Sequence, residues 1–417
     1  MLGPRLSNIQ LLGVLASFVI GLGSDSSDAQ DAPRDDGRNT VLMHYMPWYE
    51  TPDVRGKWGP HWTGWQKQHD PSTTDKFGLP DIWSHYHPLI GPYDSADPDA
   101  VECQLQQMKL AGVDGVIADW YGIIDHYDYL PNHVATQVLF EQAGEVGMTF
   151  SVCFEDRTVQ ELVKAGKADE DNLGATLAKT FEWTHENWFT HAHYQRYKGR
   201  PLVLNFGPIF IKDPGPWREG FASLPERPAF FALHHLWRDV GADGGFTWVH
   251  TDAFYDEEGR DRGDDEIARR FAGLYERVSG DPEQVITSAV PGFHDVYTNS
   301  YSYLAHRGGE TLKRHLRAAM ASESPVVQLV TWNDYGEGTI IEPTHEFGYL
   351  FLEILQDTLR AEGGDLAFTH EDLRLPGRLY RARKSGAAAS STLDRIASML
   401  NRGDTSSARR ALDRISE

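Results

Sequence analysis

The segment from Val326 to Thr344, VVQLVTWNDYGEGTIIEPT, puts two carboxylic acids directly after a predicted buried strand. Its first part is a short apolar, β-branched run, which is typical of a strand covered on both faces. Asp334 and Glu337 follow three residues apart, and Gly336 between them gives the chain a place to turn. We therefore expect both carboxyl groups to line one pocket, where such a pair can do acid and base chemistry.

The alternative for this segment is a polar loop whose aspartate caps the following helix. Trp332, Asn333 and Tyr335 stand among the acids, and a simple cap needs none of them. We therefore favour a catalytic role, in which the neighbouring aromatic rings exclude water from Glu337 and raise its pKa.

Other polar and aromatic side chains are expected at the ends of the remaining strands. In parallel α/β folds these ends form the mouth of the sheet, where ligands bind. The residues concerned are His44, Tyr45, Asp119, Trp120, Tyr121, Glu155, Asp156, Asn205, Trp248 and His250. Lys and Arg are scarce among them, which argues against a phosphate or carboxylate substrate. A carbohydrate suits the set better, and the candidate rings for stacking on a sugar are Trp48, Trp58, Trp62 and Trp120.

Eight short apolar runs must position these residues. The predicted strands cover residues 41–45, 115–118, 149–154, 202–204, 229–233, 246–249, 285–289 and 326–331. Apolar residues at helical spacing predict helices between most of them, the clearest over residues 98–111, 173–188, 267–278, 312–320 and 347–359. We therefore predict an α/β fold, a (β/α)8 TIM barrel, with an open doubly wound sheet as the alternative. No GxGxxG motif follows the first strand and no P-loop occurs, which removes that alternative's commonest functions.

The chain is expected to divide into four parts. Residues 1–29 are typical of a secretory signal peptide, with Arg5 before an apolar stretch that is short for a membrane span. Residues 30–40 form a flexible linker, 41–362 the barrel, and 363–417 a short C-terminal extension with one or two amphipathic helices over 390–415. We expect a secreted or periplasmic protein, or a membrane-anchored one if the signal is not cleaved.

A long polar and aromatic loop is predicted after the first strand, ending near residue 94. It exceeds an ordinary connection, so we expect it to have a function. The net charge of −22 argues against nucleic acids and anionic membranes as partners. Cys103 lies in a helical pattern and Cys153 in a strand, so we expect two buried free thiols, with a disulfide as the alternative.

Two histidine patterns suggest a metal-dependent hydrolase, namely His85-x-His87 and His234-His235. The first falls in the long loop, and adjacent residues on a strand point in opposite directions. We therefore expect neither a catalytic metal nor another cofactor. No GxSxG motif is present, so a serine nucleophile is also poorly supported.

The motif residues resemble two known families. Residues 331–337, TWNDYGE, resemble the signature of glycoside hydrolase family 71, the α-1,3-glucanases. The continuation GTIIEP is more similar to family 99, the endo-α-mannosidases, whose motif reads roughly NEWHEGTQIEP. HYMPWY at 44–49 and WGPHW at 58–62, which adds His61 to the candidate ligands, also resemble family 99, while DWY at 119–121 fits both. Both families are (β/α)8 barrels that cleave α-linked glycans without a catalytic metal.

The resemblance implies roles for the two acids. Glu337 matches the general acid/base position of both families. Asp334 matches the second carboxylate, which is an aspartate in the family 71 pattern and a glutamate in family 99. In the family 99 mechanism that glutamate deprotonates the sugar 2-hydroxyl to form a 1,2-anhydro intermediate. A family 71-like pair instead acts in direct displacement by water.

We therefore predict a glycoside hydrolase that cleaves an α-glucan or an α-mannan, with Glu337 as general acid and Asp334 as its partner. The expected substrate is an oligo- or polysaccharide. A barrel that binds carbohydrate without cleaving it is the second hypothesis, and the presence of both acids argues against it. A metal-dependent hydrolase is the third.

Overall fold

The structure, a computed structural model, describes residues 38–256, 260–297 and 303–416. The predicted signal peptide and most of the predicted linker lie outside this part of the chain. No helix within the described ranges is both long and apolar enough to cross a bilayer.

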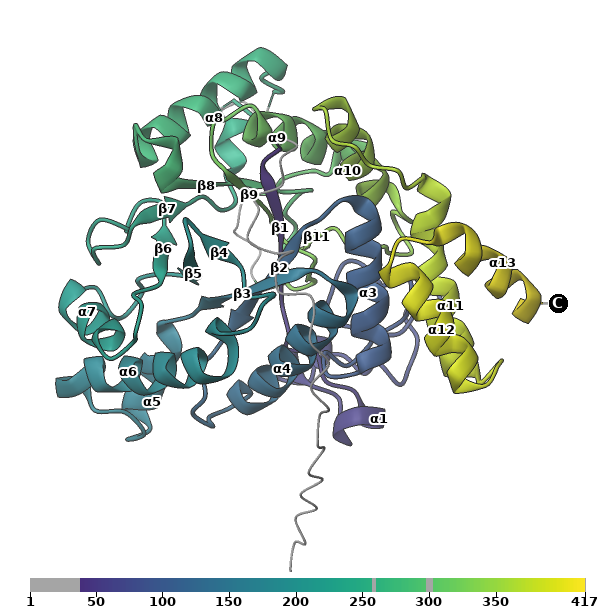
Figure 1. Cartoon of the computed structure of the whole chain (residues 1–417), viewed down its shortest axis with the longest axis horizontal. Helices are drawn as coiled ribbons and strands as arrows, with labels where there is room; N and C mark the ends of the chain where they lie inside the picture. The colour runs from purple at the N-terminus through teal and green to yellow at the C-terminus, as the bar shows by residue number, and fades with distance from the viewer. Residues whose placement is uncertain (1–37, 257–259, 298–302, 417) are drawn as a thin grey trace, which may run out of the picture. The chain divides into compact units, whose positions relative to one another are not determined.

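Eight parallel strands form a closed barrel (Figure 1). They are β1 (Thr40–Tyr45), β2 (Gly115–Trp120), β3 (Thr149–Phe154), β5 (Arg200–Asn205), β6 (Ala229–Leu233), β7 (Gly244–Phe246), β8 (Val285–Ala289) and β9 (Val326–Leu329). Each strand pairs in parallel with the next, β3 pairs directly with β5, and β9 pairs back onto β1. The short β4 (Arg196–Tyr197) pairs antiparallel with β5 and takes no place in the ring. The predicted (β/α)8 barrel is therefore confirmed.

Successive side chains on each strand alternate between the barrel interior and the surrounding helices. Val41 and Met43 of β1 pack in the layer between the strands and the helices. Leu42 packs inside the barrel with Ile117 of β2 and Cys153 of β3. This alternation decides which strand-end residues face the mouth of the barrel.

Eight α-helices lie around the ring (Figure 1). They are α3 (Pro98–Ala111), α4 (Tyr129–Val146), α5 (Arg157–Lys164), α6 (Leu173–Thr184), α7 (Pro214–Ala222), α8 (Asp264–Val278), α9 (Glu310–Met320) and α10 (Leu350–Ala361). The helices predicted from apolar spacing are present, and α6 continues into a π-helical turn, η2 (His185–Phe189). The sequence prediction missed α5 and α7.

The connection between β6 and β7 contains only turns, which explains why no helix pattern was found there. The sixth strand was placed too late in the sequence, because it begins at Gly244 and ends at Phe246. Its first two residues are glycines, which carry no strand signal. A Cβ on Gly244 would lie 2.4 Å from the carbonyl oxygen of Gln284, so a side chain does not fit there.

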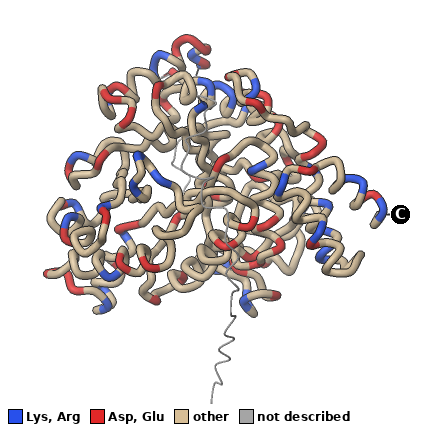
Figure 2. Tube along the Cα trace, in the orientation of Figure 1, with Lys and Arg blue, Asp and Glu red and all other residues tan. Residues whose placement is uncertain are grey.

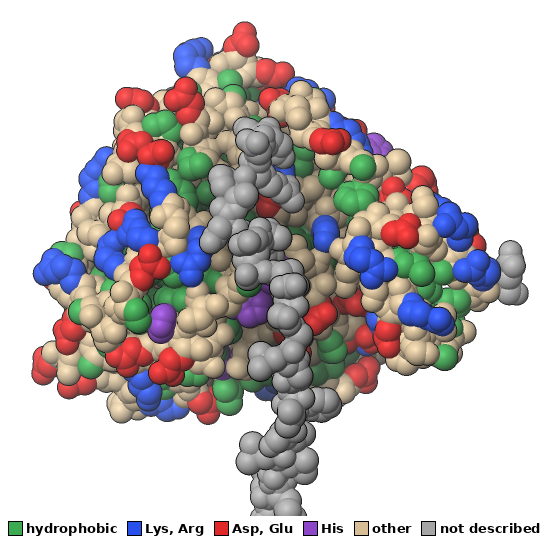
Figure 3. Space-filling view, viewed as in Figure 1, with side chains coloured by type: hydrophobic (Ala, Val, Ile, Leu, Met, Phe, Trp, Pro, Cys, Tyr) green, Lys and Arg blue, Asp and Glu red, His purple; other side chains and the backbone are tan. Residues whose placement is uncertain are grey.

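The C-terminal residues form three helices beside α3 (Figure 1). They are α11 (Leu375–Ser385), α12 (Ser390–Asn401) and α13 (Thr405–Ser416). The two predicted amphipathic helices correspond to α12 and α13, whereas α11 was missed because Pro376 and Gly377, which are poor helix formers, stand in its first turn. Arg383 pairs with Glu102 of α3 at 3.1 Å, and Lys384 pairs with Asp97 at 2.8 Å. Figure 3 shows further Lys and Arg side chains over these helices.

Asp156, directly after β3, is fully buried and organises the loop that follows β5. Its carboxylate accepts backbone N–H groups of Ile209 at 2.9 Å, Phe210 at 2.6 Å and Ile211 at 2.7 Å. Because three backbone N–H groups occupy this carboxylate, it is not available to bind a ligand at the mouth of the barrel. Asp156 was predicted to bind a ligand, but its contacts show that it stabilises the loop after β5.

Asp156→Ala is expected to lower the free energy of unfolding by about 3 kcal/mol or more, because it leaves three buried N–H groups without acceptors. Asp213→Ala is the control, since Asp213 caps only the exposed start of α7 and its loss costs about 1 kcal/mol. Urea denaturation of both variants measures the difference. A loss for Asp156→Ala no larger than that of the control would contradict the proposed support.

Candidate active site

Asp334 and Glu337 lie in a single tight hairpin beyond the end of β9. The hairpin pairs β10 (Asn333–Asp334) with β11 (Thr339–Ile340). Thr331 fixes its base, because its hydroxyl accepts the Asp334 N–H at 2.8 Å. The Glu337 N–H donates to Asp334 Oδ1 at 2.9 Å, so the aspartate also shapes the turn that carries the glutamate.

The loop after β8 holds the tip of this hairpin in place. The His294 N–H donates to the Glu337 carbonyl at 2.8 Å, and the Val296 N–H donates to the Gly336 carbonyl at 2.9 Å. Gly338 has a φ of +67°, and a Cβ there would lie 2.6 Å from the His294 carbonyl oxygen. The position therefore requires glycine both for its conformation and for this close approach.

Burial shifts the pKa of both hairpin acids upward. Burial raises the pKa of Asp334 to about 6, against the opposing effect of the Glu337 N–H. Burial, and then the charge of Asp334, raise the pKa of Glu337 well above its usual range. Glu337 Oε2 is buried and has no hydrogen-bond partner among the described residues, as suits a carboxyl group that must hold a proton. In the neutral pH range the pair is thus expected to carry one proton.

Two further acids from neighbouring strands join the hairpin pair. Burial and the charge of Glu155 raise the pKa of Asp119 well above its usual range, and the hairpin acids add to this shift. Burial raises the pKa of Glu155 to about 7, and the exposed Arg157 opposes that shift. Asp119, Glu155, Asp334 and Glu337 therefore form one interacting group, called the acid cluster below. Figure 2 shows that Lys and Arg lie mainly along the outer helices and loops.

His44 and Trp248 lie beside the acid cluster. Burial lowers the pKa of His44 to about 3, so the imidazole is neutral. The Trp248 ring meets it edge-on at 4.9 Å, and a hydrogen bond from Trp248 limits the pKa shift of Glu337. Trp248 is one of the strand-end residues named from the sequence, although its strand was predicted over residues 246–249 and runs from Gly244 to Phe246.

Tyr297, in the loop after β8, closes over the hairpin. A Cβ on Gly336 would lie 1.9 Å from the Tyr297 hydroxyl. The Tyr297 side chain is 43% exposed, so it lies at the solvent side of the acids. Burial and the charge of Asp334 raise the pKa of this hydroxyl. No motif marks Tyr297 in the sequence, and only its contact with Gly336 reveals it.

The loop after β1 supplies a stacked pair of rings. Trp48 lies parallel to His61 at 4.4 Å, and His61 Nε2 lies 3.1 Å from Asp128 Oδ2. The centroid of the Tyr121 ring lies 6.3 Å from that of Trp48. Burial raises the pKa of Tyr121, and the charges of Asp119 and Glu155 raise it further. This group thus extends the acid cluster toward the solvent, and the half-buried Trp58 packs at its edge.

Several predicted ligand residues face away from the acid cluster. Tyr45 and Trp120 alternate to the outer layer of the strands, where they bond to Gln104 and His133. Trp62 donates to the Tyr93 carbonyl at 2.9 Å, Trp332 is fully buried in the outer core, and Asn205 lies 3.4 Å from Asp156. These side chains are buried in the scaffold. Strand alternation and local packing decide which way each side chain points, and the residue type alone does not reveal this.

Asn333 and Tyr335 connect the hairpin to the loop after β1. Asn333 Oδ1 accepts the Met46 N–H at 2.8 Å. The Tyr335 hydroxyl donates to Glu342 Oε2 at 2.8 Å. Glu342 also accepts from Tyr93 at 2.9 Å and from Gln104 of α3 at 2.8 Å. The motif thus contains a supporting network as well as the two acids.

The histidine patterns have other partners. His87 Nδ1 lies 2.9 Å from Glu346 Oε1. His85 stacks on His294 at 3.6 Å, and His234 meets the ring of His250 at 4.9 Å. Both cysteines are buried free thiols, so the disulfide alternative is excluded.

The raised pKa values predict that the folded protein loses stability as the pH rises. In the unfolded chain such a carboxyl group has a pKa of about 4.3. Its pKa is higher in the folded protein, so between these two pKa values the folded state binds more protons than the unfolded state. The free energy of unfolding then falls with rising pH. Glu337→Gln should stabilise the protein at pH 8 by on the order of 1–2 kcal/mol, and by less at pH 5.

Urea denaturation at the two pH values checks this expectation, with Glu346→Gln as the control. Burial acts to raise the pKa of Glu346, but hydrogen bonds from His87 lower it overall. Removing this carboxylate should therefore destabilise the protein. Equal effects of Glu337→Gln at both pH values would contradict the assignment.

The chain is similar in sequence to known glycosidases. The family model Glycosyl hydrolase family 99 matches residues 37–227, which include the ends of β1, β2, β3 and β5. Glycoprotein endo-alpha-1,2-mannosidase of Xenopus laevis is 22% identical over 336 residues, 72% of this chain and 69% of the relative. Glycoprotein endo-alpha-1,2-mannosidase-like protein of Mus musculus is 23% identical over 348 residues, 76% of this chain and 72% of the relative.

A solved structure shares the fold. The GH99 endo-alpha-mannosidase from Bacteroides thetaiotaomicron superposes with a TM-score of 0.57 and 18% sequence identity, covering 84% of this chain and 99% of that one. The chain is a glycoside hydrolase whose sequence and fold are similar to those of family 99.

Proposed function

We propose that this chain hydrolyses α-mannosidic bonds in an oligo- or polysaccharide, with Glu337 as general acid and Asp334 as its partner. The observation that carries the proposal is the hairpin, which joins two buried, interacting acids in one turn beyond β9. The names of the relatives support mannose as the sugar.

The order of the two pKa values supports the division of roles. Between the pKa of Asp334, about 6, and the higher pKa of Glu337, the aspartate is ionised while the glutamate is protonated. Glu337 then gives its proton to the glycosidic oxygen as the bond breaks. Asp334 accepts a proton either from the sugar 2-hydroxyl or from an attacking water.

The surrounding residues suit a neutral sugar. Asp119, Glu155 and His44 offer acceptors and a neutral imidazole to hydroxyl groups. Trp48 and Trp248 offer ring faces at the rim. A substrate carrying negative charge would meet the acid cluster and be repelled.

We also propose the remaining parts of the chain on sequence grounds. Residues 1–29 direct export, and residues 30–40 link this signal to the catalytic unit. Residues 41–362 form the catalytic unit, and residues 363–417 are an accessory extension. Secretion or a periplasmic location suits an enzyme for polymeric glycans.

Glu337→Gln should lower kcat by about 10³-fold while leaving glycan binding intact, because only the proton donor is lost. The test incubates the full chain with α-mannans and α-1,3-glucan and follows reducing ends. Glu346→Gln is the matched control, an acid-to-amide change at a residue bonded to His87 outside the acid cluster. Cleavage of glucan alone would overturn the mannan assignment. Binding without any cleavage would favour a non-catalytic barrel.

The anomer of the first product, read by NMR, tests the role of Asp334. Retention is expected if Asp334 activates the sugar 2-hydroxyl, as the family 99 resemblance implies. Inversion would mean that Asp334 activates water directly. Asp334→Asn should abolish turnover in either case.

The pH–rate profile should be bell-shaped, with a rising limb near pH 6 from Asp334 and a falling limb at higher pH from Glu337. Asp295 adds negative charge near Glu337. Asp295→Asn should therefore move the falling limb to lower pH, by about half a unit. Asp357→Asn, on the outer face of α10, should leave the profile unchanged. A falling limb that moves to higher pH would contradict the role of Glu337.

A further inference from the structure

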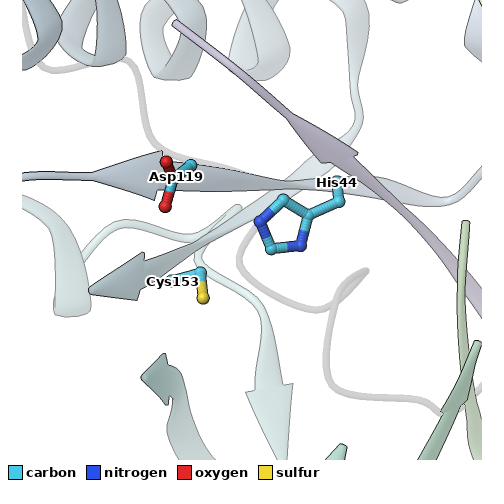
Figure 4. A group of neighbouring side chains, drawn as sticks. All are labelled: His44, Asp119 and Cys153. Carbon is cyan, nitrogen blue, oxygen red and sulfur yellow. The ribbon is translucent and has the colours of Figure 1, made fainter. Parts of the chain in front are cut away.

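Three buried side chains of different chemistry meet inside the barrel, and one of them, Asp119, belongs to the acid cluster. His44, Asp119 and Cys153 come from the adjacent strands β1, β2 and β3, and one ligand atom of each lies within 4.8 Å of the others. They are 1%, 3% and 0% exposed. Asp119 and Cys153 are direct partners in the register between β2 and β3, so both point into the barrel. In Figure 4 the His44 ring extends from β1 toward these two side chains.

The His44 ring has an unused polar atom. Its Nδ1 is buried without a hydrogen-bond partner among the described residues, and Gln328 Oε1 on β9 is in the same condition. The amide nitrogen of Gln328 donates to the Thr247 carbonyl at 2.8 Å, which orients the Gln328 side chain. A histidine that binds a metal usually directs its second nitrogen to such an oxygen.

We propose that His44, Asp119 and Cys153 form a binding site for Zn²⁺ inside the barrel, which shares Asp119 with the acid cluster, and that its occupation inhibits hydrolysis. One nitrogen, one oxygen and one sulfur ligand, with the fourth position open, make a set that zinc accepts. A tetrahedral site needs donor separations of about 3.5 Å. The three donor atoms lie within 4.8 Å of one another. Rotation of the Asp119 and Cys153 side chains brings them to the separation that a bound zinc requires.

The inhibitory part of this inference rests on the proposed function. Asp119 is one of the residues proposed to bind the sugar hydroxyl groups, and a Zn²⁺ ion bound to its carboxylate withdraws it from the sugar. Cys153 binds as the thiolate, and its proton passes to the solvent.

Cobalt provides a direct probe of this site, because Co²⁺ takes the same ligands and absorbs visible light. The purified full chain is titrated with Co²⁺ under anaerobic conditions. We expect one equivalent to produce visible bands together with a near-ultraviolet sulfur-to-cobalt charge-transfer band, and Zn²⁺ to remove both. Cobalt at surface histidines, such as His191 and His193, gives no sulfur band.

Two variants assign the sulfur. Cys153→Ser should abolish the charge-transfer band and weaken zinc binding about 10- to 100-fold. Cys103→Ser is the matched control, since Cys103 is also a buried free thiol but lies on α3, and the band should persist. Asp119→Asn keeps the shape of the side chain and should weaken zinc binding while the sulfur band remains. Circular dichroism confirms that each variant is folded.

The absence of a sulfur band in the wild type would overturn the metal site, as would a band that survives Cys153→Ser. The spectra do not depend on hydrolysis, so a failure of the proposed function would leave this result intact. In the hydrolysis assay, zinc at the concentration that saturates the spectral change should reduce kcat at least about tenfold. Full activity of the zinc-loaded enzyme would overturn the inhibitory role alone.

Discussion

The pairing of β9 with β1 is the contact on which the site depends. It joins the first and last strands of the barrel, so the ring has no open edge. It also brings the loop after β1 onto the hairpin, where Met46 and Asn333 bond although they are 287 residues apart in sequence. His44 and Asp334 belong to one mouth only because these two strands are neighbours. The hairpin by itself would be a short exposed turn.

The acid cluster sets function against stability. Acids that share one buried site cannot all ionise, so burial and the charges of neighbouring acids raise the pKa values in this cluster. The barrel tolerates this because β-strand hydrogen bonds and the surrounding helices hold the mouth in place, independently of the charges. A strained arrangement of charges on a rigid frame is what a proton donor near neutral pH requires.

Much of the fold followed from local patterns in the sequence. Buried parallel strands are apolar runs, so β1, β3, β6 and β8 were found almost to the residue. β7 was shifted because two glycines carry no strand signal. α11 was missed because Pro376 and Gly377 separate its buried leucines, and its ion pairs with the start of α3 leave no local pattern.

The site could be predicted only in part, because the sequence does not show in which direction a side chain at the end of a strand points. Asp334 and Glu337 stand out because two acids beside Gly336 directly after a buried strand have no use in packing. Tyr45 and Trp120 have the same residue types as true rim residues, but they alternate to the outer face. Tyr297 reaches the hairpin from another loop, and a contact across the fold leaves no local pattern. Asp156 shows the converse, since an acid at a strand end serves backbone N–H groups.

The network around Glu342 limits how freely this active site can be rearranged. Its carboxyl group joins Tyr335 of the hairpin, Tyr93 of the loop after β1 and Gln104 of α3. A new specificity is often sought by exchanging one loop between related barrels, as if each loop were a separate module. Here the loop after β1 and the catalytic hairpin share buried hydrogen bonds, so they form a single inherited unit. A transplanted loop would have to bring its own tyrosine, or leave a buried acid without its partner.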